Sequence, residues 1–239
     1  PAAQPATLEL EGAVRLAGEL SALSDGRLKL DATRLLAGPA VGGKVSLRSG
    51  MVATLGLRGP GGGLEPERLL RAYRLGIFPW FPEHSRHVLW WSPAPRCVIF
   101  PQRAHVSRRT RRRFNSGHYE LTLNRAFPEV IGACAEPRAN EPGTWITPAM
   151  EQAYTSLHEL GYAHSLEVWL DGELVGGLYG VSLGAAFFGE SMFARRRDAS
   201  KVAFVETVRW LASREIRLID CQVSNPHLLA FGAEEWSRP

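Results

Sequence analysis

The sequence has few of the features that mark a metalloprotein, a disulfide-rich secreted domain or a membrane protein. Its 239 residues include only three cysteines, Cys97, Cys134 and Cys221, which form no CxxC motif and leave an odd number. Neither a disulfide framework nor a zinc site is therefore indicated. The most apolar stretch, residues 175–189, is shorter than the roughly 20 residues that cross a bilayer, and the N-terminus lacks the order of a signal peptide. We expect a cytoplasmic protein without a metal or a membrane role.

Two segments of the chain lack particular residue types, and each absence bears on the structure or the cofactor that we expect. Residues 1–50 contain no aromatic residue and show no clear period, so we expect an extension of unknown structure. No glycine occurs from Ser191 to Phe231. Acetyl-CoA-dependent N-acyltransferases bind pyrophosphate there with the N–H groups of a glycine-containing loop. We therefore expect no bound cofactor, even if the fold is shared.

What is present is an ordinary globular composition, 45% hydrophobic and 22% charged, in which capping residues predict three helices. Pro66 suits a first helical turn and Gly76 the residue after a helix end. Thr147 is a strong N-cap, with Gly161 as the stop, and Asp198 can cap a third helix. The predicted helices cover residues 64–75, 148–160 and 199–213.

Turn signals and apolar patterns predict strands between and after these helices. Asp171-Gly172 is the strongest short hairpin signal in the chain. The predicted strands cover residues 165–170, 173–181, 185–191 and 218–225. The prolines of residues 78–93 instead predict a rigid, aromatic-rich loop region. The order helix, antiparallel strands, helix, strand indicates an α+β fold.

Arginine is concentrated in one short run, with six arginines in eleven residues and no glutamate among them. A solvated helix face would usually mix both signs of charge. Arginine matches phosphate oxygens with paired hydrogen bonds, so the run predicts contact with a nucleic-acid backbone. The run consists of Arg103, Arg108, Arg109, Arg111, Arg112 and Arg113. A second basic group, Arg195, Arg196, Arg197 and Lys201, follows the third predicted strand.

An acid and an amide lie two residues apart near the end of the last predicted strand. Strands repeat every two residues, so Asp220 and Gln222 share one face. Such a pair can orient a neutral amine for attack on an activated carbonyl without a metal, thiol or cofactor. Cys221 points the other way, toward the core, which disfavours a cysteine nucleophile. Glu190 ends an apolar strand and needs a cation or a backbone donor if it is buried.

Four tryptophans, Trp80, Trp90, Trp91 and Trp145, admit two interpretations. Large aromatic side chains usually belong to the core. Because these lie beside prolines and a basic helix, one or two of them could instead stack on an unpaired base.

Ten ordered motifs lie between about residues 61 and 238. They are Gly76-Ile77-Phe78-Pro79-Trp80-Phe81, Trp90-Trp91-Ser92-Pro93, Pro95-Arg96, Gly143-Thr144-Trp145-Ile146-Thr147, Ala163-His164-Ser165, Glu173-Leu174-Val175-Gly176-Gly177-Leu178-Tyr179-Gly180, Gly189-Glu190-Ser191-Met192-Phe193, Ala199-Ser200-Lys201, Asp220-Cys221-Gln222 and Gly232-Ala233. With these motifs the sequence resembles the leucyl/phenylalanyl-tRNA–protein transferases, bacterial enzymes that move an amino acid from charged tRNA to the N-terminus of a protein.

The resemblance implies a small N-terminal domain, residues 51–95, and a GNAT-like (acetyltransferase-like) domain, residues 96–239, with a mostly antiparallel sheet and no acetyl-CoA. Residues 1–50 do not resemble the family. The family takes Leu, Phe or Met from aminoacyl-tRNA and attaches it to proteins that begin with Arg or Lys, which marks them for degradation. A monomer is expected.

The resemblance also assigns roles to residues. Asp220 and Gln222 would position or activate the α-amine, and Glu190 and Asn225 would hydrogen-bond the substrates. The remaining substrate contacts would be Trp80 and Trp145 on the terminal adenosine, Tyr154, and an apolar pocket of Leu178, Phe187, Phe204 and Ile219. Two alternatives stay open at this point: an acetyl-CoA-dependent N-acyltransferase and a non-catalytic RNA-binding module.

Overall fold

The computed structural model describes residues 4–10, 14–22, 28–37, 51–55, 63–81, 88–137 and 144–237, the first four ranges by their backbone alone. The chain forms two compact units. The first comprises residues 1–95, 138–145 and 237–239, and the second comprises residues 96–137 and 146–236. The sequence predicts three domains, residues 1–50, 51–95 and 96–239, and this division into three stays a prediction.

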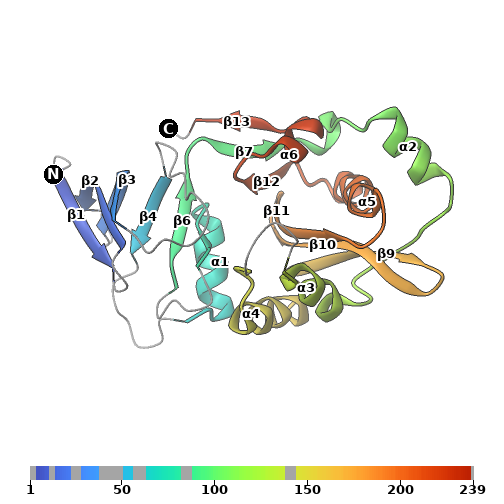
Figure 1. Ribbon diagram of the computed structural model, residues 1–239, viewed down its shortest axis with the longest axis horizontal. Helices are drawn as coiled ribbons and strands as arrows, with labels where there is room; N and C mark the ends of the chain where they lie inside the picture. Colours follow the sequence, from blue (N-terminus) through green and yellow to red (C-terminus); the bar gives the residue numbers. More distant parts are fainter. Residues whose placement is uncertain are drawn as a thin grey trace. The chain divides into compact units, whose positions relative to one another are not determined.

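The first unit is built on a six-stranded sheet in the order β1-β2-β3-β4-β6-β5 (Figure 1). Its strands are β1 (Gln4–Leu10), β2 (Val14–Ala22), β3 (Leu28–Ala37), β4 (Met51–Leu55), β5 (Phe78–Pro79) and β6 (Trp90–Pro93). Helix α1 (Pro66–Arg74) confirms the first predicted helix, and Gly76 follows it with φ of 69°.

The prediction that residues 78–93 form a loop region is wrong for β5 and β6. Strand β6 lies inside the sheet, paired with both β4 and β5. Pro79 and Pro93 are the last residues of their strands. A proline at a strand end interrupts little of the hydrogen-bond ladder, so the prolines limit the lengths of these strands without preventing them.

The second unit is built on a seven-stranded sheet in the order β13-β7-β12-β11-β10-β9-β8. Its strands are β7 (Arg96–Ile99), β8 (Glu120–Leu123), β9 (Ala163–Leu170), β10 (Glu173–Leu183), β11 (Ala186–Ala194), β12 (Leu218–Gln222) and β13 (Glu234–Trp236). Only β11 and β12 are paired in parallel. The mostly antiparallel sheet and the helices around it confirm the α+β class.

The hairpin of β9 and β10 forms where the sequence predicts it. Asp171 and Gly172 have φ of 53° and 81°, the left-handed conformation that a two-residue type I′ turn requires at both central positions. The pairing of β10 with β11 continues the antiparallel sheet.

The helices of the second unit are α2 (Arg108–Asn115), α3 (Phe127–Ala135), α4 (Pro148–Glu159), α5 (Ala199–Ser213), α6 (Pro226–Ala230) and the 3₁₀ turn η1 (Pro101–Arg103). Thr147 caps α4, as predicted, by accepting a hydrogen bond from the N–H of Met150 at 3.3 Å. Asp198 directly precedes α5 but makes no capping bond, so that part of the prediction is wrong. No helix in the described ranges is long and apolar enough to cross a membrane.

The helices cover both faces of this sheet, α5 on one and α3 with α4 on the other (Figure 1). Two adjacent residues of β10 show the division. Leu178 belongs to the core cluster that includes the apolar residues of α5. Tyr179 makes edge-to-face contacts with Phe127 of α3 and Tyr154 of α4, at centroid distances of 5.8 and 5.6 Å.

Gly180 leaves less room for a Cβ than any other glycine of the described residues, and we expect Gly180→Ala to destabilise the second unit. A Cβ there would lie 2.3 Å from the carbonyl oxygen of Phe188 and 2.5 Å from the ring of Phe187. Overpacking of this kind costs about 1–3 kcal/mol. Chemical denaturation should show the loss, whereas Gly132→Ala in α3, with nothing within 4 Å, should be neutral or stabilising. Equal midpoints for the two variants would contradict the packing described here.

Candidate active site

Asp220 of β12 is held by Arg96 of β7 in a buried, two-pronged ion pair. The Nε and Nη2 of Arg96 donate to Oδ1 and Oδ2 of Asp220 at 2.7 and 2.9 Å. The residues are 8% and 6% exposed. A bidentate guanidinium fixes the plane of a carboxylate as well as its charge. Asp220 therefore has one defined orientation.

Gln222 departs from the strand geometry that the sequence predicts. The register between β12 and β7 shifts between Asp220 and Gln222, and Gln222 has φ of 56°. The shift brings the backbone N–H of Gln222 to 3.0 Å from Oδ1 of Asp220. The carboxylate therefore stabilises a left-handed backbone that is uncommon for a residue other than glycine.

Glu190 joins this pair from the neighbouring strand. In β11, Gly189 pairs with Gly180 and Ser191 with Tyr179, which leaves Glu190 as the extra residue of a β-bulge. Bulges commonly turn a side chain out of its regular direction near active sites. Oε1 of Glu190 accepts from Nε2 of Gln222 at 3.1 Å.

Tyr154 of α4 completes the arrangement, because its hydroxyl donates to Oε2 of Glu190 at 3.2 Å. With its NH₂ group on Glu190, Gln222 presents Oε1 as an acceptor that has no hydrogen-bond partner among the described residues. A carboxamide oxygen can accept a proton-bearing nitrogen from a substrate. The structure thus brings together four residues that the sequence singles out: Asp220, Gln222, Glu190 and Tyr154.

Arg96 is the member of this group that the sequence reasoning missed. Arg96 belongs to the motif Pro95-Arg96, for which the sequence predicts no role. The available signal was its place at the start of the buried strand β7, whose residues are all buried. A buried charge requires a partner of opposite sign, but sequence alone does not identify a partner 124 positions away.

The four predicted pocket residues lie together in the core cluster on the α5 face of the sheet, where they are almost fully buried. These residues are Leu178, Phe187, Phe204 and Ile219. Glu190, by contrast, bonds to Tyr154 on α4. The four residues therefore share one apolar core, and Ile219 pairs with Phe187 between β12 and β11. Their role toward a substrate stays a prediction.

Asn225 and the two tryptophans also stay predictions as substrate contacts. The Oδ1 of Asn225 accepts from the N–H of Leu228 at 2.9 Å and caps α6, so this oxygen is already used. Trp80 is 41% exposed and packs edge-on against Trp91 at 6.2 Å. Trp80 and Trp145 both belong to the first unit.

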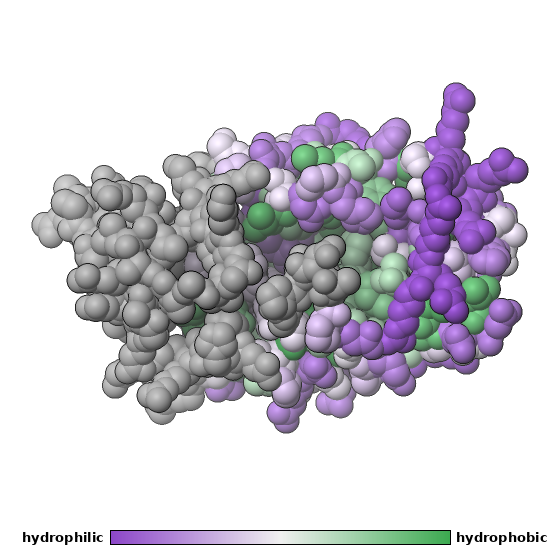
Figure 2. Space-filling view, in the orientation of Figure 1, coloured by the Kyte–Doolittle hydropathy of each residue, from purple (hydrophilic) through white to green (hydrophobic). Residues whose placement is uncertain are grey.

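The arginine run is divided between two elements. Arg103 lies in η1, where its Nη2 contacts Oε1 of Glu234 at 2.7 Å. The remaining five arginines of the run lie in α2, whose N-cap is Ser107. In Figure 2 hydrophilic residues gather over the part of the second unit that carries α2.

Cys221 is buried beside Cys97, and their hydrogen bond, together with burial, raises the pKa of the Cys221 thiol well above its usual value. A protonated buried thiol is a poor nucleophile. We expect Cys221→Ala to keep most of the aminoacyl-transfer activity that the resemblance implies, measured in the folded protein. A folded variant without activity would restore the cysteine hypothesis.

Among the described residues, no group of three or more His, Cys, Asp or Glu side chains is arranged to hold a metal.

Comparison with known proteins identifies the family. The model of the leucyl/phenylalanyl-tRNA protein transferase family matches residues 98–239, and the model of its N-terminal domain matches residues 62–94. The chain belongs to this family. Residues outside these two matches include 1–50, which the sequence sets apart.

Relatives named leucyl/phenylalanyl-tRNA–protein transferase are similar over most of the chain. The protein of Chromobacterium violaceum is 55% identical over 77% of this chain and 78% of its own length. That of Anaeromyxobacter sp. is 57% identical, with the same shares covered. Among solved structures, FemX covers 72% of this chain and 66% of its own at 10% identity and a TM-score of 0.49. A GCN5-related N-acetyltransferase from Kribbella flavida covers 78% and 83% at 11% identity and a TM-score of 0.40.

Proposed function

We propose that the chain transfers Leu, Phe or Met from aminoacyl-tRNA to the N-terminal Arg or Lys of a protein, and that Asp220 and Gln222 position the attacking amine. As a member of this transferase family it is an aminoacyltransferase that uses aminoacyl-tRNA and a protein as substrates. The observation that carries the assignment of residues is the unpartnered Oε1 of Gln222, aimed by Glu190 and by the bulge at Asp220.

The reaction joins the α-nitrogen of the acceptor protein to the carbonyl carbon of the aminoacyl ester. The neutral amine donates one N–H to Oε1 of Gln222, which directs its lone pair at the carbonyl carbon. A C–N bond forms, the ester C–O bond breaks, and the nitrogen loses a proton while the tRNA 3′-oxygen gains one. The ester is already activated, so alignment of two bound reactants can supply about 7–11 kcal/mol of the barrier.

In this proposal Asp220 orients Gln222 and does not remove the proton itself. Both of its oxygens already accept hydrogen bonds from Arg96, and Oδ1 also accepts the N–H of Gln222. The Arg96–Asp220 pair thereby fixes the backbone from which the Gln222 amide projects. Glu190 and Tyr154 hold the Gln222 amide in one orientation.

The remaining contacts follow from the same assignment. We assign Leu178, Phe187, Phe204 and Ile219, which lie in the apolar core of the α5 face, to the transferred side chain. An apolar site of this kind discriminates by only about 1–3 kcal/mol per methylene, which suits a site that accepts several large apolar residues. Trp80, Trp145 and Asn225 hold the tRNA end and the acceptor.

Charged tRNA is made where translation occurs, so we expect the reaction to take place in the cytoplasm. The extended proteins are marked for degradation.

Incubation with Leu-tRNA and a peptide beginning with Arg tests the proposal. Mass spectrometry should show the peptide extended by one leucine, and an N-acetylated copy of the peptide should remain unchanged because it lacks a free amine. Binding of charged tRNA without consumption would favour a non-catalytic RNA-binding module. A rise in melting temperature with acetyl-CoA would favour an N-acyltransferase.

A further inference from the structure

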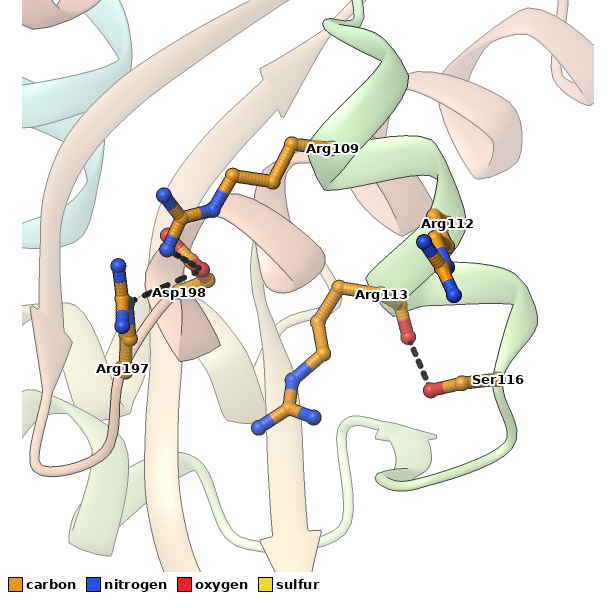
Figure 3. Close-up of a pocket in the computed structure, with 6 residues that line it drawn as sticks. All are labelled: Arg109, Arg112, Arg113, Ser116, Arg197 and Asp198. Carbon is orange, nitrogen blue, oxygen red and sulfur yellow. Dashed lines mark hydrogen bonds and ion pairs between the residues drawn. The ribbon is translucent and has the colours of Figure 1, made fainter.

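A cavity of about 340 Å³ lies between α2 and the start of α5 (Figure 3). Its lining is strongly basic. The lining residues are Arg109, Arg112, Arg113, Ser116, Arg197 and Asp198. The cavity thus joins the basic run of α2 to the second basic group after β11, two features that are separate in the sequence.

Asp198 is the single acid in this lining. Three cations share its carboxylate, so one negative charge is divided among three positive charges. Nη2 of Arg109 lies 3.4 Å from its Oδ2, Nε of Arg197 lies 3.9 Å from the same oxygen, and Nζ of Lys201 lies 3.2 Å from Oδ1. Figure 3 shows Arg109 of α2 and Arg197 of the turn before α5 converging on Asp198. Both arginine contacts are long, so most of the guanidinium N–H groups are not used by Asp198.

The other two arginines leave further positive charge uncompensated. Arg112 has no ion-pair or hydrogen-bond partner through its side chain among the described residues. Arg113 contacts the ring of Tyr119 at 5.3 Å, a contact that leaves its charge intact. Four guanidinium groups therefore border a space that holds one carboxylate. The missing ligand should be a compact anion with several acceptor oxygens, which is the chemistry of a phosphate group.

The surroundings of Asp198 keep its carboxylate ionised, and its backbone has a conformation that an asparagine could also adopt. Its partial burial opposes ionisation, but the hydrogen bond and charge of Lys201 and the nearby Arg109 and Arg197 lower its pKa below the usual value. The residue has φ of 63°, a conformation that Asp and Asn tolerate better than most residues. An asparagine there would remove the charge and leave the backbone unchanged.

We propose that this cavity binds one backbone phosphodiester of the tRNA, and that Asp198 competes with it for Arg109 and Arg197. The carboxylate holds the two guanidinium groups in place before tRNA arrives, and it limits how tightly the phosphate binds, which favours release of the product tRNA. This inference rests on the proposed function, because that function makes tRNA the partner of the basic surface.

Binding of deacylated tRNA, followed by fluorescence anisotropy across a salt series, tests the inference. Arg112→Ala and Arg197→Ala should each weaken binding and reduce the slope of log affinity against log salt, by at most about 0.7–0.9, the value for complete loss of the one phosphate contact. Asp198→Asn should tighten binding by about two- to fivefold, because it removes a weak competing ion pair. Arg125→Ala is the matched control: Arg125 is as exposed as Arg109, also pairs with an acid, Glu120, and lies outside the cavity.

The outcomes separate this inference from the proposed function. Wild-type protein that does not bind tRNA would overturn both. Normal wild-type binding with Arg112→Ala and Arg197→Ala equal to Arg125→Ala, or weaker binding by Asp198→Asn, would overturn the cavity assignment alone. Inorganic phosphate should raise the melting temperature more than chloride at equal ionic strength, and Arg112→Ala should abolish the difference. The same phosphate effect with unchanged tRNA binding by Arg112→Ala and Arg197→Ala would assign the cavity to a free anion instead of tRNA.

Discussion

Asp220→Asn is expected to lower the rate of leucine transfer by about 10²–10⁴-fold, the range for loss of one positioned catalytic group, while tRNA affinity changes little. The asparagine keeps the size of the side chain and one oxygen for the N–H of Gln222. It loses the negative charge, and its NH₂ group faces an N–H of Arg96 where an oxygen accepted a bond at 2.7 or 2.9 Å. This repulsion moves the side chain out of the plane that Arg96 fixed, so its oxygen no longer holds the N–H of Gln222, and the charge of Arg96 is left uncompensated beside the attacking amine.

The measurement compares single-turnover transfer from Leu-tRNA with tRNA binding by anisotropy, in folded protein well below its melting temperature. Asp171→Asn is the control, because Asp171 is an exposed carboxylate in the turn between β9 and β10, and both of its values should match wild type. Equal losses of rate and affinity in Asp220→Asn would show that Asp220 supports tRNA binding or folding and has no specific catalytic role.

Arg96→Met is expected to reduce the free energy of unfolding by about 3–5 kcal/mol, because it leaves Asp220 as a buried charge without its partner. The double variant Arg96→Met, Asp220→Leu should recover much of this loss, since replacing both members of a buried ion pair with apolar residues is often neutral or stabilising. The double variant should nevertheless be inactive. Urea denaturation and the transfer assay together separate the contribution of the pair to stability from its contribution to catalysis.

A surface pair provides the comparison for this cycle. Arg125 and Glu120 are both 62% exposed and lie 3.1 Å apart, and Arg125→Met should cost less than about 1 kcal/mol. An active double variant would contradict the role of Asp220 in positioning Gln222. A double variant as unstable as the worse single variant would instead show that Arg96 and Asp220 act on stability through other contacts.

The parts of the fold that sequence predicts well are those specified by neighbouring residues. Thr147 caps α4, Asp171-Gly172 turns β9 into β10, and α5 begins after Asp198. The capping bond of Asp198 was predicted wrongly because its carboxylate binds cations from α2 and α5 instead. Strands β7, β8 and β13 are short and depend on partners distant in the chain, so local patterns did not reveal them.

In the candidate site, too, local patterns predict the residues but not the contacts between residues distant in the chain. Strand period and residue type select Asp220, Gln222 and Glu190, which the structure joins by hydrogen bonds. The bulges that turn Glu190 and Gln222 toward each other exist only in register with neighbouring strands, and a single-sequence period of two does not contain that information. The sequence marks Arg96 only as a charged residue in a buried strand and does not identify its partner.

The single-turnover rate of Gln222→Ala, measured with saturating Leu-tRNA and a peptide that begins with Arg, tests most directly whether this amide aligns the reacting groups. We expect a rate lower than that of wild type by at least about 10²-fold, with both substrates bound as tightly as by wild type. A folded Gln222→Ala variant that transfers leucine at the wild-type rate would contradict this expectation.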